Sequence, residues 1–379
     1  MPDEQGRVDV ARSETAVTVE VLTAGPGDCI LVECHRRIGP PWRLLIDGGL
    51  PEFWPQLRRR LAAIDDDRRR IDVLVVSHVD SDHIGGLLPL LSGEWTDLAL
   101  DIGDVWFNGP PLLPSAAEAR RRSLAQGQAL VEILTGVGAG AGLALPWNVA
   151  FAGCAVSTGP DAGLRTVEVG AGGPVITLLS PTDRRLRALE RSWFRYLDRL
   201  KRGEPSQDPE PRQPPVPLDD LDALAATAVP ADRSIPNGSS IAFLLEHRGV
   251  RCLFAADAHV SVLGAALYAL TDRRGGPIEL DLFKLPHHGS QGNVSLALLE
   301  LAPAHHYVVS TTGERFEHPD DVALARVATT SPPGSMLWFN HDSAPNRRWS
   351  SPRLQNRWRF GTGFAPADGP GLRFELEAR

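Results

Sequence analysis

The fold of this sequence is decided by one short stretch, His78-Val79-Asp80-Ser81-Asp82-His83. Its histidines and aspartates place four side chains that can ligate a metal within six residues. The stretch follows directly after the apolar, β-branched run 71–77, which is typical of a strand buried on both faces. Buried carboxylates this close together repel one another and need a compensating cation. The pattern therefore predicts a metal site, and the alternative is a polar surface turn.

Two later segments offer the same kinds of side chain at the ends of predicted strands. Asp257 follows the strand 252–254, and the pair His287-His288 follows the strand 280–285. Open α/β sheets bind ligands at the carboxyl ends of their strands, so we expect these residues to join the first cluster in one site. Imidazole and carboxylate together suit zinc, manganese or iron, whereas calcium prefers oxygen ligands alone.

Strand and helix patterns alternate along the rest of the chain. The predicted strands are 17–23, 29–34, 42–46, 71–77, 175–179, 239–245, 250–254, 280–285, 307–310 and 336–339. The predicted helices are 52–64, one beginning near 85–86, 115–135, 181–202, 259–271, 294–301 and 320–329. This alternation predicts an α/β fold in which sheets are sandwiched between helices.

Composition excludes several classes of protein. With 379 residues, 42% of them hydrophobic, the chain is too apolar to be disordered as a whole, and we treat 1–379 as a single domain. No apolar run approaches the ~20 residues that span a bilayer, and residues 1–20 lack a secretory signal. We therefore expect a cytoplasmic protein with no membrane partner and with reduced cysteines. The net charge of −8 argues against nucleic-acid binding through bulk electrostatics.

The order of these motifs resembles the metallo-β-lactamase superfamily, and within it the branch seen in the C-terminal domain of ComEC-type DNA-uptake proteins. The motifs that carry the resemblance are Gly27 to Val32, Leu45 to Gly49, Ser77 to Gly86, Leu179 to Pro181, Asn237 to Ser240, Phe254 to Asp257, Lys284 to Ser290 and His318-Pro319. The resemblance implies an αββα four-layer sandwich with a metal centre at one edge of its two sheets. The extra sequence 104–236 is expected to be an insertion, partly helical and partly disordered. It includes the basic helix 181–202 and the proline-rich loop 203–217.

The resemblance also implies roles for individual residues. Carried over by position, the metal ligands are His78, Asp80, Asp82, His83, Asp257 and His288. The first two would hold one cation, the next two a second, and the carboxylate of Asp257 would bridge both. His288 is preferred over His287 for completing the second site. Asp47 would lie at the floor of the site and fix the loop 78–83 by hydrogen bonds.

Two departures from the family pattern affect one of the metal pockets. Many members carry a histidine where this chain has Asp80, and a third histidine where it has Asn237. This pocket is therefore poorer in nitrogen and richer in oxygen. Weaker zinc binding, a preference for manganese, and a single-metal site all remain open. We expect one or two Zn²⁺ ions, with Mn²⁺ as the alternative.

The predicted metal centre implies hydrolysis. A bound cation lowers the pKa of its water from about 15.7 to near 7, so that a metal-bound hydroxide forms at neutral pH. The candidate catalytic residues are Asp82, His287, His318 and Lys284, the last three as proton donors. We predict a metal-dependent hydrolase, most directly a phosphodiesterase or nuclease acting on DNA, RNA or nucleotides. The alternatives are hydrolysis of another ester, thioester or lactam, and a metal-stabilised interaction module of a bacterial defence or signalling system that binds a protein partner through the insertion.

Two basic clusters bear on a nucleic-acid substrate. Residues 184–202 carry eight Lys or Arg against two acidic residues, and the segment 347–359 interleaves five arginines with two tryptophans. The first cluster could track a phosphate backbone or form an ordinary solvated helix face. The second could stack on single-stranded bases or serve strand pairing with extended arginines.

Overall fold

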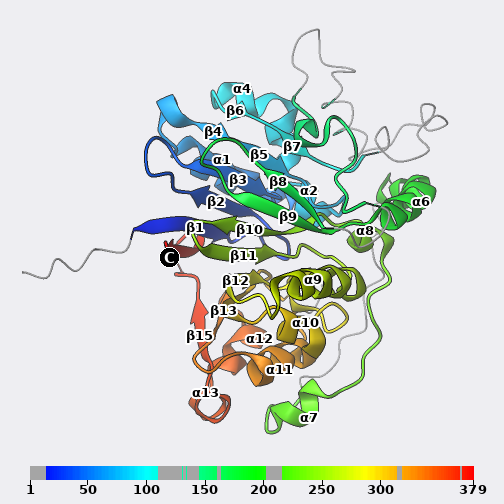
Figure 1. Ribbon diagram of the computed structural model, residues 1–379, viewed down its shortest axis with the longest axis vertical. Coiled ribbons are helices and arrows are strands. Elements are labelled where there is room, and N and C mark those ends of the chain that lie inside the picture. Colours follow the sequence, from blue (N-terminus) through cyan, green and yellow to red (C-terminus); the bar gives the residue numbers. More distant parts are fainter. Residues whose placement is uncertain are drawn as a thin grey trace, which may run out of the picture.

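Two sheets lie face to face in this protein, and helices cover the outer face of each (Figure 1). The structure is a computed structural model, and it describes residues 14–109, 130, 134, 145–159, 164–201, 216–313, 318–367 and 369–379. A small third sheet pairs β4 (Arg70–Ile71) with β6 (Asp101–Ile102). The predicted four-layer α/β sandwich is therefore confirmed.

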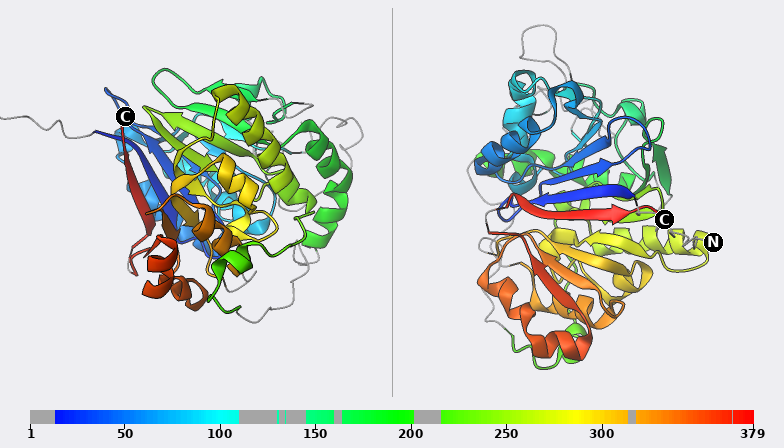
Figure 2. Two further views of the ribbon diagram at one scale, coloured as in Figure 1. Left: turned by 60° about the horizontal axis from the view of Figure 1, so that its bottom comes forward. Right: turned by 90° about the vertical axis from the view of Figure 1, so that its left-hand side faces the viewer.

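The first sheet is mixed and has the strand order β16-β1-β2-β3-β5-β7. Its strands are β1 (Thr15–Leu22), β2 (Ile30–Cys34), β3 (Trp42–Ile46), β5 (Val73–Val75), β7 (Val105–Trp106) and β16 (Gly371–Glu377). Strand β1 pairs antiparallel with both β2 and β16, whereas β3, β5 and β7 run parallel. The last strand of the chain thus returns to the sheet in which the first one lies (Figure 2). The sequence patterns did not predict β16.

The second sheet has the order β15-β14-β13-β12-β11-β10-β9-β8. Its strands are β8 (Arg165–Glu168), β9 (Val175–Ser180), β10 (Ala242–His247), β11 (Val250–Phe254), β12 (Leu280–Lys284), β13 (Ala304–Val309), β14 (Met336–Phe339) and β15 (Gly361–Phe364). Strands β8 to β11 pair antiparallel, and β11 to β15 run parallel. The carboxyl ends of these parallel strands therefore share one edge of the sheet.

Alternation of side chains along the strands builds three apolar layers. Val17, Val19 and Val21 of β1 face the second sheet, where Phe243 and Leu245 of β10 belong to the same buried cluster. Successive side chains of a strand point to opposite faces, so the intervening positions are free to pack against the helices. This fills the space between the sheets and leaves the outer faces for the helical layers.

The outer layers are made of helices of very different length. On the first sheet lie α1 (Trp54–Ala62), α2 (Ser81–Ile84), α3 (Leu87–Pro89), α4 (Trp95–Asp97) and α6 (Asp183–Lys201). On the second lie α7 (Leu221–Ala225), α9 (Val260–Arg274), α10 (Leu296–Leu301), α11 (Asp321–Thr330) and α13 (Pro352–Trp358), and α12 (Ala344–Arg347) precedes α13. Every helix in the described part of the chain is too short or too polar to cross a bilayer.

The segment 104–236 is built into the sheets more than the sequence suggested. Strands β7, β8 and β9 all lie within it, and of these the sequence predicted only β9, as the strand 175–179. Strand β7 has two residues and β8 alternates half-buried with exposed positions, which leaves little apolar signal. The predicted basic helix 181–202 is α6, which begins at Asp183 because Ser180 still belongs to β9. Most of the predicted helix 115–135 and most of the loop 203–217 lie outside the described residues, and the two described positions of that helix, Leu130 and Leu134, are helical and buried.

Candidate metal centre

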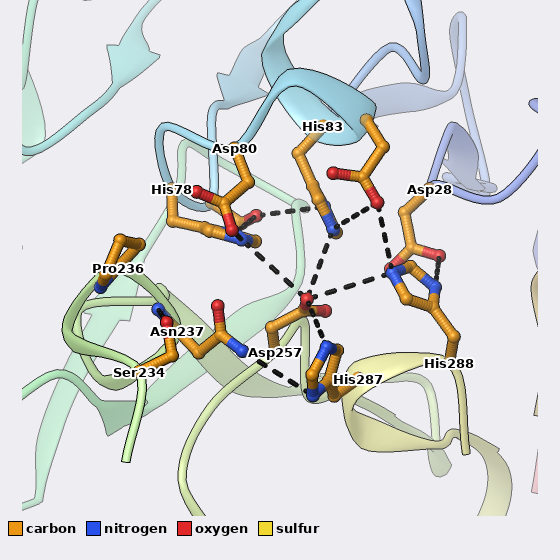
Figure 3. A network of polar contacts seen from close by, with 12 residues as sticks. Asp28, His78, Asp80, His83, Ser234, Pro236, Asn237, Asp257, His287 and His288 are labelled. Carbon is orange, nitrogen blue, oxygen red and sulfur yellow. Dashed lines mark hydrogen bonds and ion pairs between the residues drawn. The ribbon is translucent and has the colours of Figure 1, made fainter. Parts of the chain in front are cut away.

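Polar side chains from several segments meet where the carboxyl ends of the parallel strands reach one edge of the sandwich (Figure 3). Asp47 follows β3, and the stretch 78–83 follows β5 in the first sheet. In the second sheet, Asp257 follows β11, and the short turn η7 (Pro286–Gly289) with His287 and His288 follows β12. Residues that are some two hundred positions apart in sequence are thus brought to one place, as the strand-end argument predicted.

The end of the stretch 78–83 is helical where the sequence suggested a loop. Helix α2 begins at Ser81, so Asp82 and His83 lie on its first turn, and the helix predicted to begin near 85–86 is α3, whose N-cap is Gly86. The helix closes onto the end of β3, where the amide of Gly48 donates to the carbonyl of His83 at 2.8 Å. A Cβ on Gly86 would lie 2.0 Å from the carbonyl oxygen of Gly48, so only glycine permits this approach.

Asp47 holds this helix and the end of β5 together. Its Oδ1 accepts the amide of Ser77 at 2.8 Å, and its Oδ2 accepts the hydroxyl of Ser77 at 2.6 Å. The same Oδ2 lies 2.8 Å from Nδ1 of His83. These contacts fix the imidazole of His83 with Nε2 directed away from Asp47 and into the cluster. The floor position and the hydrogen bonds predicted for Asp47 are what the structure contains.

The carboxylate of Asp257 lies at the centre of the cluster. Its Oδ2 is 3.5 Å from Nε2 of His83 and 3.7 Å from Nε2 of His78, His287 and His288. Nε2 of His78, His83 and His288 is buried and has no hydrogen-bond partner in the described part of the chain. Two ligands of one tetrahedral zinc ion, each about 2.1 Å from it, lie about 3.4 Å apart. The spacing and the unpartnered nitrogens therefore fit a cation.

The remaining carboxylates divide the cluster into two pockets that share Asp257. In the first pocket, Oδ2 of Asp80 lies 3.6 Å from Nε2 of His78. In the second pocket, Oδ2 of Asp82 lies 3.6 Å from Nε2 of His288 and 4.0 Å from Nε2 of His83. Nδ1 of the same His288 imidazole lies 2.8 Å from the carbonyl of Ser310. A ligating histidine usually donates its other N–H in this way. His288, unlike His287, also groups with Asp82 and His83, which favours it for the second pocket.

Comparison with known proteins agrees with this arrangement. Residues 22–101 match the family model of the Metallo-beta-lactamase superfamily. The matched segment contains Asp47 and the whole stretch 78–83. No curated protein matches the chain in sequence.

Several solved structures are similar to the chain. The metallo-beta-lactamase fold protein YhfI from Bacillus subtilis is 11% identical, covers 95% of this chain and 99% of its own, and gives a TM-score of 0.42. CmlA, a diiron beta-hydroxylase from Streptomyces venezuelae, is 13% identical over 97% of this chain and 55% of its own, with a TM-score of 0.41. Zn²⁺-bound PqqB from Methylobacterium extorquens is 13% identical over 95% of this chain and 100% of its own, with a TM-score of 0.40.

Charge in the candidate metal site is balanced among buried groups. Burial raises the pKa of Asp257, but His83 and His288 beside it hold that pKa well below its ordinary value. Burial lowers the pKa of His288, yet Asp257, Asp28 and Asp82 raise it to about 9. The pKa of His83 is likewise raised well above its usual range, because Asp257 and Asp47 outweigh burial. The carboxylates therefore need positive charge between them, which either imidazolium groups or a metal cation can supply.

His287 and His318 lie beside the cluster and are slightly more exposed than its other members. Nδ1 of His287 is 3.0 Å from Oδ1 of Asn293, so it carries the proton, and Nε2 faces Asp257 with its lone pair. Burial lowers the pKa of His287 and thereby favours the neutral ring. The ring of His318 packs edge-on against that of His287, with centroids 4.8 Å apart. The structure thus places His287 against the carboxylate of Asp257 and His318 behind it.

Lys284 occupies a different place from the one predicted. Its Nζ lies 2.8 Å from Oδ2 of Asp28 and donates to the carbonyl of Leu285 at 3.0 Å. Both side chains of the pair are almost fully buried. The ammonium therefore serves an internal ion pair under the site, and we withdraw Lys284 as a candidate proton donor.

Two polar residues of the candidate site were given no role from the sequence. Oδ1 of Asp28 lies 3.6 Å from Nδ1 of His288, and Oδ2 of Asp232 accepts the side-chain amides of Asn237 and Asn293 at 2.9 and 3.1 Å. The pair Gly27-Asp28 after a strand was visible in the sequence as part of the resemblance, without a role. Asp232 carries no local signal, because its segment 226–234 has no regular secondary structure.

Proposed function

We propose that this chain is a metal-dependent hydrolase with the metallo-β-lactamase fold. The observation that carries the proposal is the group of buried, unpartnered Nε2 atoms of His78, His83 and His288 around the carboxylate of Asp257. When bound, the cation supplies an acidified water and a Lewis acid for charge that develops on oxygen. Three of the four cysteines are free and buried, which supports the cytoplasm as the proposed location.

The side chains of the site divide the remaining work between holding and proton transfer. Asp47 orients His83, and the carbonyl of Ser310 orients His288, so the pockets are rigid before any ligand arrives. Asn293 fixes the tautomer of His287 and leaves the lone pair of Nε2 free to accept a proton near the reacting atoms. A proton taken from the attacking water at this position and then passed to the leaving group would complete bond cleavage.

Replacing His287 by glutamine is expected to lower the turnover of a phosphodiester about 10²-fold, the lower end of what one acid–base group contributes, because His318 lies beside it. Metal content measured by elemental analysis is expected to stay at the wild-type value. His305→Gln, on an exposed position of β13, is the matched control and should leave turnover unchanged. Loss of metal in the His287 variant would assign this side chain to the ligands instead.

We infer that the substrate is a phosphodiester in nucleic acid or a nucleotide, as the resemblance to the ComEC branch implies. Helix α6 supports this choice, because Arg184, Arg187 and Arg191 are exposed on it and make no ion pair with other described residues. The helix lies beside α8 (Ile235–Gly238), which carries Asn237 of the site (Figure 1). A row of free cations next to the metal pockets suits a polyanionic chain.

The experiment that tests the proposal compares three substrates in the presence of zinc or manganese. Bis-p-nitrophenyl phosphate and single-stranded DNA are expected to be hydrolysed, a thioester is expected to be left intact, and a chelator should stop the reaction. Hydrolysis of the thioester alone would replace the phosphodiester assignment by another member of the hydrolase class. Absence of any metal-dependent hydrolysis, with tight capture of a protein, would favour an interaction module.

The same assay tests the arginine row. Changing Arg184, Arg187 and Arg191 together to alanine should weaken binding of single-stranded DNA. The slope of the logarithm of the binding constant against the logarithm of salt concentration should become less negative by about 2, because each lost phosphate contact contributes about 0.7. Cleavage of bis-p-nitrophenyl phosphate should not change. In the C-terminal cluster Arg347 and Arg348 are paired with Asp342 and Asp321, so alanine at both is the comparison and should leave DNA binding intact. The reverse result would move the nucleic-acid surface to the C-terminal cluster.

A further inference from the structure

The two metal pockets differ in the atoms that they offer. The second pocket presents two imidazole nitrogens and two carboxylates, from His83, His288, Asp82 and Asp257. The first presents one imidazole, of His78, with the carboxylate of Asp80 and the shared one. Imidazole suits zinc, whereas carboxylate and carbonyl oxygens suit harder cations such as manganese or magnesium. What else faces the first pocket therefore decides which cation it prefers.

Asn237 places an amide oxygen toward this pocket. Its side chain is fully buried, and its Oδ1 has no hydrogen-bond partner among the described residues. Close to it, the amide of Ile241 donates to the carbonyl of Ser77 at 3.0 Å, which ties the end of α8 to the strand end that carries His78. Figure 3 shows the amide oxygen turned toward the side of the cluster that holds His78 and Asp80.

The orientation of that amide is set by Asp232. Nδ2 of Asn237 donates to Oδ2 of Asp232 at 2.9 Å. A carboxylate accepts hydrogen bonds and donates none, so the nitrogen must face Asp232 and the oxygen must face the opposite way. Asp232 is itself held by the backbone amide of Ser234 at 2.7 Å and by Nδ2 of Asn293 at 3.1 Å. The unpartnered oxygen is thus a built feature of the site.

His287 does not fill the same place. Its Nε2 faces Oδ2 of Asp257 at 3.7 Å, but it joins none of the groups of His, Cys, Asp and Glu atoms in the described chain that lie within 4.8 Å of one another. His78, by contrast, does so together with His83 and Asp257. His83 also belongs to the group of Asp82 and His288 in the second pocket, so His78 is the one imidazole of the first pocket that the second does not share.

We propose that Asn237, oriented by Asp232, is an oxygen ligand of the first pocket and makes it selective for a hard divalent cation such as Mn²⁺, while the second pocket takes Zn²⁺. This inference rests on the proposed function, because it assumes that the cluster holds metal. The resident centre is then mixed, with one ion of each kind sharing the carboxylate of Asp257. An imidazole at position 237 would convert the first pocket to a zinc site.

The test is metal stoichiometry of the full chain. Protein stripped with a chelator is dialysed against a mixture of Zn²⁺ and a large excess of Mn²⁺, because zinc binds most sites more tightly. After desalting, elemental analysis of the wild type should give one zinc and one manganese per chain, with a manganese signal in electron paramagnetic resonance. Asn237→His in the same mixture should hold two zinc ions. Asn237→Ala should keep its zinc and lose manganese.

A further variant tests the orienting role of Asp232. Asp232→Ala leaves the ligand in place but frees its amide, and should weaken manganese about 10–100-fold without loss of zinc, the usual effect of removing a partner of a ligand. Any one of three results would overturn the inference. These are two zinc ions in the wild type, the same zinc and manganese content in the wild type and in Asn237→His, and undiminished manganese in Asn237→Ala. Circular dichroism checks folding of every variant. The metal content is measured independently of hydrolysis. A protein that holds one ion of each kind but hydrolyses nothing would therefore contradict the proposed function and leave the inference about Asn237 standing.

Discussion

Replacing Asp82 or His83 by alanine is expected to abolish hydrolysis while the chain still folds. Both side chains belong to the second pocket, where Nε2 of His83 lies 3.5 Å from the shared carboxylate and Asp82 lies 3.6 Å from His288. Loss of either leaves three of the four ligands of the second pocket and weakens its hold on a cation. The rate should fall by at least about 10²–10³-fold, the loss that follows removal of a single preorganised charge-stabilising group. Turnover of bis-p-nitrophenyl phosphate measures it.

The fold should survive because the apolar layers do not depend on these two side chains. Circular dichroism and elemental analysis on the same samples should give a native spectrum with reduced metal content. Asp220→Ala is the matched control, since Asp220 accepts the amide of Ala223 as the cap of α7, which Figure 1 shows well away from α2 and α8. That variant should lose about 1 kcal/mol of stability and no activity. Activity of either second-pocket variant near the wild-type level would refute the site.

The sequence placed the site residues together because the ends of their strands can be recognised from the pattern. The runs before His78, Asp257 and His287 are short and mostly apolar, and each of these residues comes three positions after the last residue of its strand. The parallel β11 and β12 then bring Asp257 and His287 to one edge without further information. What the pattern could not give is the local backbone. Helix α2 begins at Ser81, and the chain around it packs against the end of β3 through the close approach of Gly86 to Gly48. This long-range contact cannot be read from a local pattern.

Backbone strain at the site was also invisible in the sequence. Asp47, His287 and His288 have positive φ angles of 56°, 46° and 55°, a region that these residue types enter at a cost of about 1–3 kcal/mol each. All three are held by the hydrogen bonds that aim their side chains into the cluster. Such conformations concentrate at functional sites because surrounding structure compensates for them. The backbone conformation of Asp47, His287 and His288 therefore also indicates a functional site at this edge of the sandwich.

Long-range partners were the main omission. Asp28 and Asp232 act on residues 260 and 61 positions away in sequence, His288 and Asn293. No periodicity or spacing reports such pairs, because they follow from topology and not from local pattern. The pairing of β16 (Gly371–Glu377) was missed for the same reason. Its partner in the sheet, β1, lies at the other end of the sequence. Resemblance to a family supplied the motif around Asp28, and the structure supplied its function.

Lys284→Met is expected to destabilise the protein by about 3–5 kcal/mol, because it leaves a buried carboxylate without its counter-charge. Burial raises the pKa of Asp28, but the ammonium of Lys284 outweighs it and holds that pKa well below its ordinary value. Removing the ammonium makes Asp28 either ionised and unpaired or protonated at neutral pH, and both cost stability. Chemical denaturation of chelator-treated protein measures the change free of any contribution from bound metal.

The double variant Asp28→Asn with Lys284→Met separates the pair from the site that it supports. Removing both charges should recover most of the lost stability, whereas Arg274→Met, which breaks the partly exposed pair with Glu246, should cost less than about 1 kcal/mol. A loss below 1 kcal/mol in Lys284→Met would show that the pair is not needed. Turnover of both variants, measured well below the melting temperature, then decides whether Lys284 takes part in proton transfer. If Lys284 only holds Asp28 beneath His288, the folded single variant still hydrolyses its substrate, whereas a proton donor would leave a stable but inactive enzyme in the double variant.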